Sequence, residues 1–165
     1  MKVYKYNSVL NENRIPVMVQ DKTVAYKVDN RRKFECSSDM YDLGRALNLH
    51  NMPDEYVYCA CFDCRMHVVG FFEVSHGSAL CSLIDKRSVF QKALLLNAVY
   101  ICLMHNHPSG DVDPSGADIK TTKTIKTAGD MIGIGLVDHV IIGDGCYCSM
   151  RQNGSTSNIF KRKEN

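Results

Sequence analysis

The feature that most constrains the fold is an uninterrupted apolar run at residues 98–104, which ends directly at His105. A strand whose apolar residues alternate with polar ones can keep one face in water, but a strand that is apolar on both faces must be covered on both. Since the run has the length of a strand, we predict a fully buried central strand here. The polar residues that follow it are then expected at an edge of the sheet.

Strands and helices are predicted to alternate around this central strand, which indicates an α/β layered sandwich with a mixed central sheet flanked by helices. Ser37 or Ser38 can cap a first helix that ends near Leu47, and Asp85 can cap a second. The predicted elements are helix 37–47, a hairpin of strands 56–62 and 66–74, helix 85–97, strand 98–104, helix 115–127, and strands 136–142 and 147–150.

The two ends of the chain are predicted to lie outside the main domain. In an N-terminal β arm, strands 14–20 and 23–28 are expected to flank a turn at Asp21 and Lys22. The predicted division is an arm at 1–36, a main domain at 37–154 and a polar tail at 155–165, whose basic residues Lys161, Arg162 and Lys163 are expected to be solvated.

Composition, charge and hydropathy limit the classes of protein to which this chain can belong. The chain has 165 residues with 45% hydrophobic and 23% charged residues, the balance of one globular domain with a single core. A net charge of +2 is too small to favour nucleic-acid binding through bulk electrostatics. No apolar run reaches the roughly 20 residues that a membrane helix needs, and residues 1–10 lack the apolar segment of a secretory signal. We therefore expect a cytoplasmic protein that does not span a membrane.

The cysteines are expected to be thiols or ligands rather than a disulfide framework, because there are eight of them in a chain without a visible export signal. Cys59 and Cys61 alternate along an apolar run, which favours packing as small apolar side chains. Cys61 and Cys64, together with His67, leave open a second metal site, although their spacing falls short of a full ligand set. The structural interpretation is the favoured one.

The residues after the central strand carry the strongest functional signal. His105 and His107 alternate, so on an extended strand end both imidazoles point the same way. Ser115 opens the next helix, and Asp118 lies one helical turn further on. Two imidazoles and one carboxylate make the three protein ligands of a catalytic zinc, which keeps a fourth position for water.

Each half of this pattern also has a purely structural interpretation. Ser115 and Asp118 have the spacing of a helix capping box, which alone would explain both residues. His105 and His107 could be surface residues in a loop. The convergence of a strand end and a helix start at one sheet edge favours a site over these separate explanations, because open α/β folds bind ligands at such edges.

The same residues resemble the motif of the JAMM, or MPN-type, metalloproteases. His105, His107, Ser115 and Asp118 match its His-x-His-x7-Ser-x2-Asp pattern in full, and the run His-Asn-His-Pro-Ser-Gly from residue 105 is similar to the RadC branch of that superfamily. Further matches to this branch are Phe62-Asp63, Gly77-Ser78, Val89-Phe90, Leu96-Asn97-Ala98, Asp138-His139 and Ser149-Met150-Arg151 through Gly154.

The resemblance implies a cytidine-deaminase-like α/β sandwich that holds one Zn²⁺ per chain. It implies that His105, His107 and Asp118 are the metal ligands. It also implies that Ser115 hydrogen-bonds the zinc-bound water or stabilises the developing oxyanion.

An upstream glutamate would act as general base in such a site. Glu73 is the predicted one, because it lies four residues before Gly77 and would be at the end of a strand next to the metal; the alternative is a solvent-facing strand residue. Zinc lowers the pKa of its water to about 7 and polarises a carbonyl, while a carboxylate takes the proton and returns it to the leaving amine. The implied chemistry is hydrolysis of an amide, which in relatives includes isopeptide bonds.

The other histidines receive weaker assignments. His139 is either a partner that orients a metal ligand or, as favoured, a core histidine with satisfied hydrogen bonds. His50, His67 and His76 are expected to be surface or packing residues.

These residues are compatible with two functions. The favoured one is a zinc-dependent peptidase or isopeptidase that acts on a peptide or protein-conjugate substrate. The alternative is a DNA-repair-associated or other nucleic-acid accessory protein with a structural or relict metal site. Longer RadC proteins carry an N-terminal helical module that resembles DNA-binding helix-hairpin-helix domains. Residues 1–36 are too short for that module and are predicted as β, which weakens the expectation of nucleic-acid binding.

Overall fold

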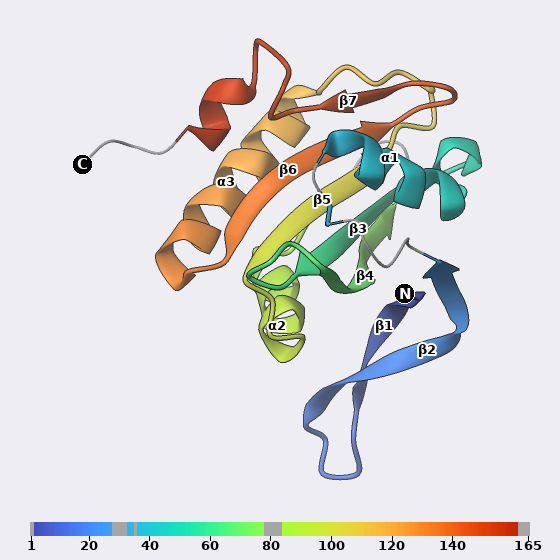
Figure 1. The fold of residues 1–165 in the computed structure, drawn as a ribbon, viewed down its shortest axis with the longest axis vertical. Helices are drawn as coiled ribbons and strands as arrows, with labels where there is room; N and C mark the ends of the chain where they lie inside the picture. The colour runs from blue at the N-terminus through green and yellow to red at the C-terminus, as the bar shows by residue number, and fades with distance from the viewer. Residues whose placement is uncertain (1, 28–32, 35, 78–83, 162–165) are drawn as a thin grey trace.

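The computed structural model describes residues 2–27, 33–34, 36–77 and 84–161. Its strands are β1 (Lys2–Leu10), β2 (Pro16–Lys27), β3 (Glu55–Phe62), β4 (Val68–Gly77), β5 (Tyr100–Asn106), β6 (Gly135–Ile142) and β7 (Tyr147–Ser149). Its helices are α1 (Ser37–Ala46), α2 (Lys86–Leu95) and α3 (Gly116–Ile132), with short 3-10 helices η1 (Leu49–Asn51) and η2 (Ser157–Phe160). The strands form one seven-stranded sheet in the order β2-β1-β4-β3-β5-β6-β7 (Figure 1).

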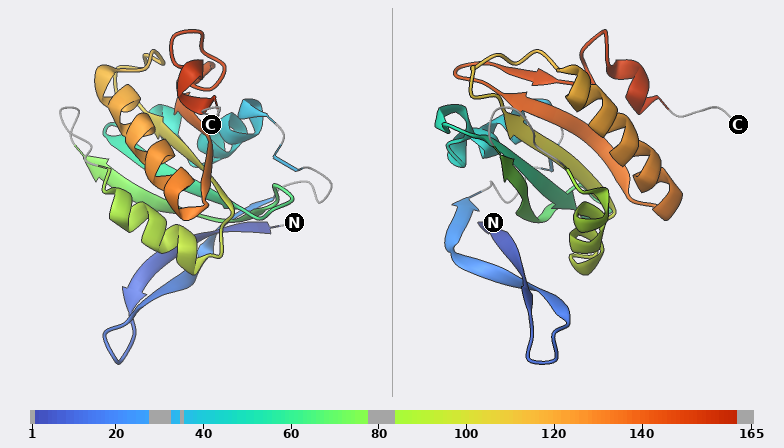
Figure 2. Two further views of the ribbon diagram at one scale, coloured as in Figure 1. Left: turned by 90° about the vertical axis from the view of Figure 1, so that its left-hand side faces the viewer. Right: turned by 180° about the vertical axis from the view of Figure 1, so that it is seen from behind.

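β5 is the central strand that the apolar run predicts. The side chains of Ile101, Cys102, Leu103 and Met104 are all 0% exposed. β5 pairs antiparallel with β3 along one edge and parallel with β6 along the other. Helices α2 and α3 cover one face of the sheet and α1 covers the other (Figures 1 and 2). The predicted α/β layered sandwich with a mixed sheet is therefore confirmed.

Successive side chains of β5 enter two separate cores, one on each face of the sheet. Met104 packs in the cluster that contains Met40 of α1. Leu103 packs in the cluster that contains Ile125 of α3, and His105 continues this second series. The fold therefore turns the imidazole of His105 toward α3.

The candidate ligands converge because several elements meet at one edge of the sheet. β5 and β6 are parallel and end together at the pair Asn106↔Ile142. The antiparallel strand β3 begins beside them, with Val57 opposite His105. α3 starts at this edge too, with Ser115 as its N-cap. This edge, at the carboxyl ends of two parallel strands, is where α/β folds bind ligands.

The N-terminal arm is a hairpin, but the predicted turn at Asp21 and Lys22 is wrong. β2 runs through these residues, and its pairing with β1 shifts there, from Tyr4↔Ala25 to Lys5↔Asp21. The chain instead reverses between Asn11 and Ile15, where the Asn11 side chain accepts a hydrogen bond from the Ile15 amide at 2.9 Å. The irregular pairing lies at the polar residues that resemble a turn in the sequence. Val28, the predicted end of the second strand, lies outside the described residues.

The described part of the C-terminal segment is folded against the domain. Its 3-10 helix η2 places Phe160 against the core that α2 and α3 cover. Lys161 is exposed, as predicted, whereas Arg162 and Lys163 lie outside the described residues. Among the residues that the structure describes, no helix combines the length and apolar character needed to cross a membrane.

α3 extends beyond its predicted end at residue 127 to Ile132, where Gly133 ends it with a left-handed φ of 78°. Gly129, inside the helix, lets the chain fold back closely after this turn. Its carbonyl accepts a hydrogen bond from the Ile134 amide at 2.9 Å. A β-carbon added at Gly129 would lie only 2.3 Å from the carbonyl oxygen of Ile134.

We predict that Gly129→Ala destabilises the protein by about 1–3 kcal/mol, because the clash with backbone outweighs the gain in helix propensity of about 1 kcal/mol. Gly116→Ala is the matched control in the same helix, since nothing lies within 4 Å of its added carbon. The midpoint of urea unfolding measures both effects. Equal midpoints for the two variants would contradict the close approach.

Candidate metal centre

Three side chains converge at the sheet edge, and they could hold a metal ion. Nε2 of His105 lies 3.0 Å from Nε2 of His107 and 3.2 Å from Oδ1 of Asp118. Nε2 of His107 lies 3.3 Å from Oδ2 of Asp118. Donors bound tetrahedrally to one zinc at about 2.0–2.1 Å are themselves about 3.3 Å apart. The spacing of these atoms therefore fits a metal of that size.

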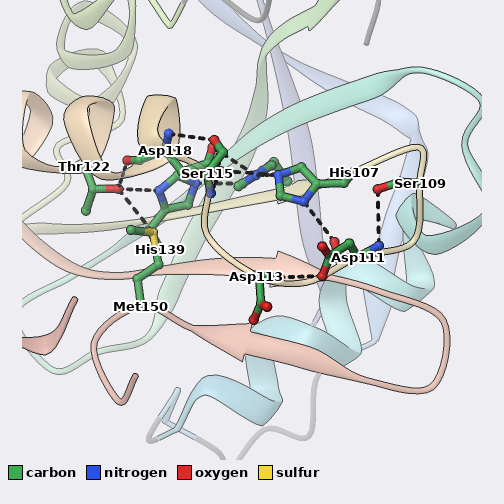
Figure 3. A network of polar contacts seen from close by, with 10 residues as sticks. His107, Ser109, Asp111, Asp113, Ser115, Asp118, Thr122, His139 and Met150 are labelled. Carbon is green, nitrogen blue, oxygen red and sulfur yellow. Dashed lines mark hydrogen bonds and ion pairs between the residues drawn. The ribbon is translucent and has the colours of Figure 1, made fainter. Parts of the chain in front are cut away.

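The proton positions on His105 follow from a buried chain of hydrogen bonds through His139 and Thr122, the two members of the chain labelled in Figure 3. The single hydroxyl hydrogen of Thr122 is donated to the carbonyl oxygen of Asp118 at 2.6 Å, so this hydroxyl can only accept from Nδ1 of His139, 2.7 Å away. Nε2 of a neutral His139 then carries no hydrogen and accepts from Nδ1 of His105 at 2.8 Å. Nε2 of His105 is left with a lone pair that faces the cluster.

His139 can take this role because it is neutral. Burial lowers the pKa of His139 well below the ordinary value, and the neighbouring His105 lowers it further. The structure thus joins the two interpretations left open by the sequence: His139 is a core histidine with satisfied hydrogen bonds, and it contacts a candidate ligand.

His107 is oriented by the loop that follows β5. Its Nδ1 lies 2.8 Å from the carbonyl oxygen of Asp111, which can only accept a hydrogen bond, so Nδ1 carries the hydrogen in the neutral ring (Figure 3). The loop returns to this position because Gly110 adopts a left-handed φ of 78° and its amide donates to the His107 carbonyl. Nε2 of His107 therefore also presents a lone pair.

Asp118 occupies the third corner and caps α3 at the same time. Ser115 and Asp118 form the capping box that the sequence pattern allows, in which Oδ2 of Asp118 accepts from the Ser115 amide at 2.8 Å. Burial raises the pKa of Asp118, but contacts with His105, His107 and Ser115 outweigh it and hold this pKa far below the ordinary value. The carboxylate is ionised, with Oδ1 turned toward His105.

The cluster attracts positive charge. Two imidazole lone pairs and a carboxylate repel one another at these distances unless a cation lies between them. The contact with Asp118 raises the pKa of His107 and outweighs the opposite effect of burial; the Asp111 carbonyl and the carboxylate of Glu55 raise it further. A proton or a metal ion at the centre of the cluster would relieve this repulsion.

The structure gives Ser115 a definite place beside the cluster. Its Oγ donates to Oδ2 of Asp118 at 2.6 Å and accepts from the Asp118 amide at 3.1 Å. With its only hydrogen used in this way, Ser115 orients the carboxylate. The predicted contact with water or an oxyanion would require the hydroxyl to turn away from Asp118.

Glu73, the predicted base, is not brought to the cluster. It pairs with Tyr58 across the sheet, and its Oε2 accepts from the Tyr58 hydroxyl and from Lys5, each at 3.2 Å. Burial raises the pKa of Glu73, but hydrogen bonds from Lys5 and His76 outweigh it and lower this pKa overall. Because Tyr58 packs in the core on the α1 side, Glu73 lies on the opposite sheet face from His105 and joins β1 to the sheet.

Glu55 is the glutamate that the sequence reasoning missed. It begins β3 two residues before Val57, the partner of His105, and so shares a sheet face with that histidine. Its charge is close enough to raise the pKa of His107. The signal available in the sequence was its place directly before the predicted strand 56–62, which belongs to the same sheet as the histidines.

The alternative cysteine site does not form. Cys61 is 0% exposed inside the core between β3 and α2, whereas Cys64 is exposed in the turn after β3. The Nδ1 atom of His67 contacts Asp63 at 3.0 Å. In the described ranges, His105, His107 and Asp118 make up the one group of three or more potential metal-binding side chains.

Comparison with known proteins identifies the family. The model of the RadC-like JAB domain matches residues 34–155, which include every residue of the cluster and Glu55. The chain belongs to this family. A RadC-like JAB domain with a His-His-Asp cluster of this geometry fits a metal-dependent hydrolase.

The RadC-like JAB domain is similar to several proteins named UPF0758. One from Shouchella clausii is 35% identical over 112 residues, which cover 68% of this chain and 49% of that protein. One from Methanococcoides burtonii is 34% identical over 129 residues, covering 78% of this chain and 56% of its own length. The chain thus spans about half the length of these relatives.

We predict that Thr122→Val weakens metal binding by the RadC-like JAB domain about 10- to 100-fold, although Thr122 touches no metal. The substitution removes the hydroxyl that fixes the proton on His139 and thereby the lone pair of His105. Thr124→Val is the matched control, because its exposed hydroxyl also bonds a carbonyl four residues back, Lys120, on the same helix. Competition with a chromogenic chelator measures the affinities. Equal affinities for both variants would contradict the hydrogen-bond chain.

Proposed function

We propose that this chain is a zinc-dependent hydrolase that cleaves an amide bond in a peptide or protein-conjugate substrate. The observation that carries the proposal is the convergence of two imidazole lone pairs and one carboxylate at tetrahedral spacing. Two nitrogen ligands and one oxygen ligand suit zinc, and three protein ligands leave one position open. Zinc bound there supplies Lewis-acid polarisation of a carbonyl and makes a water molecule more acidic.

Glu55 is the general base in this proposal. It lies at the same sheet edge and on the same sheet face as His105, and its charge reaches His107. Its carboxylate takes a proton from the attacking water and returns it to the leaving amine. His139, Thr122 and Ser115 hold the ligands in place through the hydrogen bonds described above.

The proposed compartment is the cytoplasm, where thiols stay reduced. The cysteines in the described ranges are free thiols, which supports this assignment. Burial raises the pKa of Cys59 and Cys102 well above the ordinary value, so these two thiols are poor nucleophiles and pack as apolar groups.

We predict about one zinc per chain in the purified protein and its loss in His107→Ala. His67→Ala is the matched control, since His67 lies in the turn near Cys64 and outside the cluster. Elemental analysis of the native protein, His107→Ala and His67→Ala measures the zinc content of each. If zinc is retained in His107→Ala and lost in His67→Ala, the metal binds near Cys61 and Cys64 and not at the His105 cluster.

We predict that Glu55→Gln keeps zinc but lowers turnover about 10²- to 10⁴-fold, because it removes the proton acceptor and leaves the ligands intact. Glu73→Gln, the matched control on β4, is expected to stay within a few fold of the native rate. Hydrolysis of a quenched-fluorescence library of linear peptides and lysine-linked isopeptides measures both.

The reverse result, with Glu73→Gln inactive and Glu55→Gln active, would restore Glu73 as the base. If the zinc-loaded native protein cleaves no member of the library, duplex DNA binding is titrated at two salt concentrations. A steep loss of affinity with salt would then favour the nucleic-acid accessory function.

A further inference from the structure

Asn106, between the two histidines of the cluster, makes contacts that neither ligand makes. Its side chain is 1% exposed. Oδ1 accepts a hydrogen bond from the Tyr56 amide at 2.9 Å, and Nδ2 donates to the carbonyl oxygen of Asp54 at 2.9 Å. These two backbone groups flank Glu55 on either side. A single buried side chain therefore holds the backbone before and after the proposed base.

This contact begins where the backbone pairing of β3 and β5 stops. The ladder between these strands runs from Phe62↔Tyr100 to Val57↔His105 and includes no pair beyond it. The backbone of Asn106 still pairs with β6, opposite Ile142. Its side chain thus replaces the missing step of the ladder on the β3 side and extends the attachment of β3 past Glu55.

A primary amide suits this position because it has one acceptor and one donor group at a fixed separation. The carbonyl of Asp54 and the amide of Tyr56 require one of each. A carboxylate at residue 106 would have no donor for Asp54, and a hydroxyl is too small to reach both groups at once. The residue type therefore matches the backbone of β3 and not the metal, which the neighbouring histidines face.

We propose that Asn106 is a positioning residue that fixes Glu55 opposite the candidate metal ligands. The effect on catalysis rests on the proposed function, whereas the effect on the backbone does not. A displacement of about 1 Å in a catalytic group can lower a rate about 100-fold. Loss of the Asn106 amide is therefore expected to lower kcat about 10- to 100-fold while KM changes little.

The test compares Asn106→Ala with the native protein in three measurements. Hydrogen exchange by NMR should show the Tyr56 amide exchanging at least 10-fold faster, while the amides of Cys59 and Ala60 in the same strand stay protected. Zinc content should stay at about one per chain. In the library assay, Asn106→Ala should lower kcat, and adding it to Glu55→Gln should cause no further loss, because both changes act through one carboxylate.

Asn153→Ala is the matched control, since this asparagine also accepts a backbone hydrogen bond, from Ser155, but lies away from the cluster. It should leave kcat unchanged. If Asn106→Ala does not fold, Asn106→Ser replaces it, because its hydroxyl leaves a smaller void and still cannot bridge both groups.

Three results would overturn the proposal: a Tyr56 amide that stays protected, zinc lost together with Asn106, or rate losses that multiply in the double variant. If the native protein cleaves no library member, the proposed function fails separately. Tyr56 exchange and zinc content then decide alone whether Asn106 holds the backbone around Glu55.

Discussion

The burial of β5 on both faces is the constraint on which the rest of this structure depends. It forces a helix layer onto each face, and it carries the strand end, with His105, into a setting where every polar atom needs a partner. His105 meets this requirement by donating to His139, which in turn donates to Thr122 on α3. The same bonds leave one ring nitrogen without a hydrogen. The hydrogen bonds that burial requires of His105 therefore also turn its unprotonated ring nitrogen toward the candidate metal site.

The N-terminus of α3 meets two demands with one pair of residues. Ser115 and Asp118 close a capping box, which satisfies backbone amides at the helix start. The carboxylate that serves this cap also faces His105 and His107. A cation at the centre would relieve the repulsion between the carboxylate and the lone pairs, so metal binding is expected to stabilise the folded state. The capping interpretation of this sequence pattern is confirmed, and the same carboxylate belongs to the group that could hold a metal ion.

The sequence predicted the layered fold and the three converging side chains because both depend on short-range patterns. Alternation brings His105 and His107 to one face, and one helical turn brings Asp118 beside Ser115. The sheet face on which each candidate base lies depends instead on pairing between distant strands. β4 contains an irregularity in which Ser75 pairs with Val57 and Glu73 with Tyr58, so Val74 is an extra residue. In a regular strand, Glu73 and Ser75 would lie on the same sheet face. Because Val74 is an extra residue, Glu73 lies on the face opposite to that of Ser75.

The wrongly predicted turn in the arm has the same physical origin. Polar residues at Asp21 and Lys22 lie within a strand whose pairing is irregular, and such an irregularity tolerates the same residues as a turn. The arm then attaches to the sheet through one parallel pair, Lys5↔Phe71, and through the ion pair of Lys5 with Glu73. An irregularity in β4 that removes Glu73 from the metal face thus supplies the arm with its anchor. The extra residue in β4 thus determines both which sheet face Glu73 occupies and how the arm attaches, and no local pattern in the sequence reveals it.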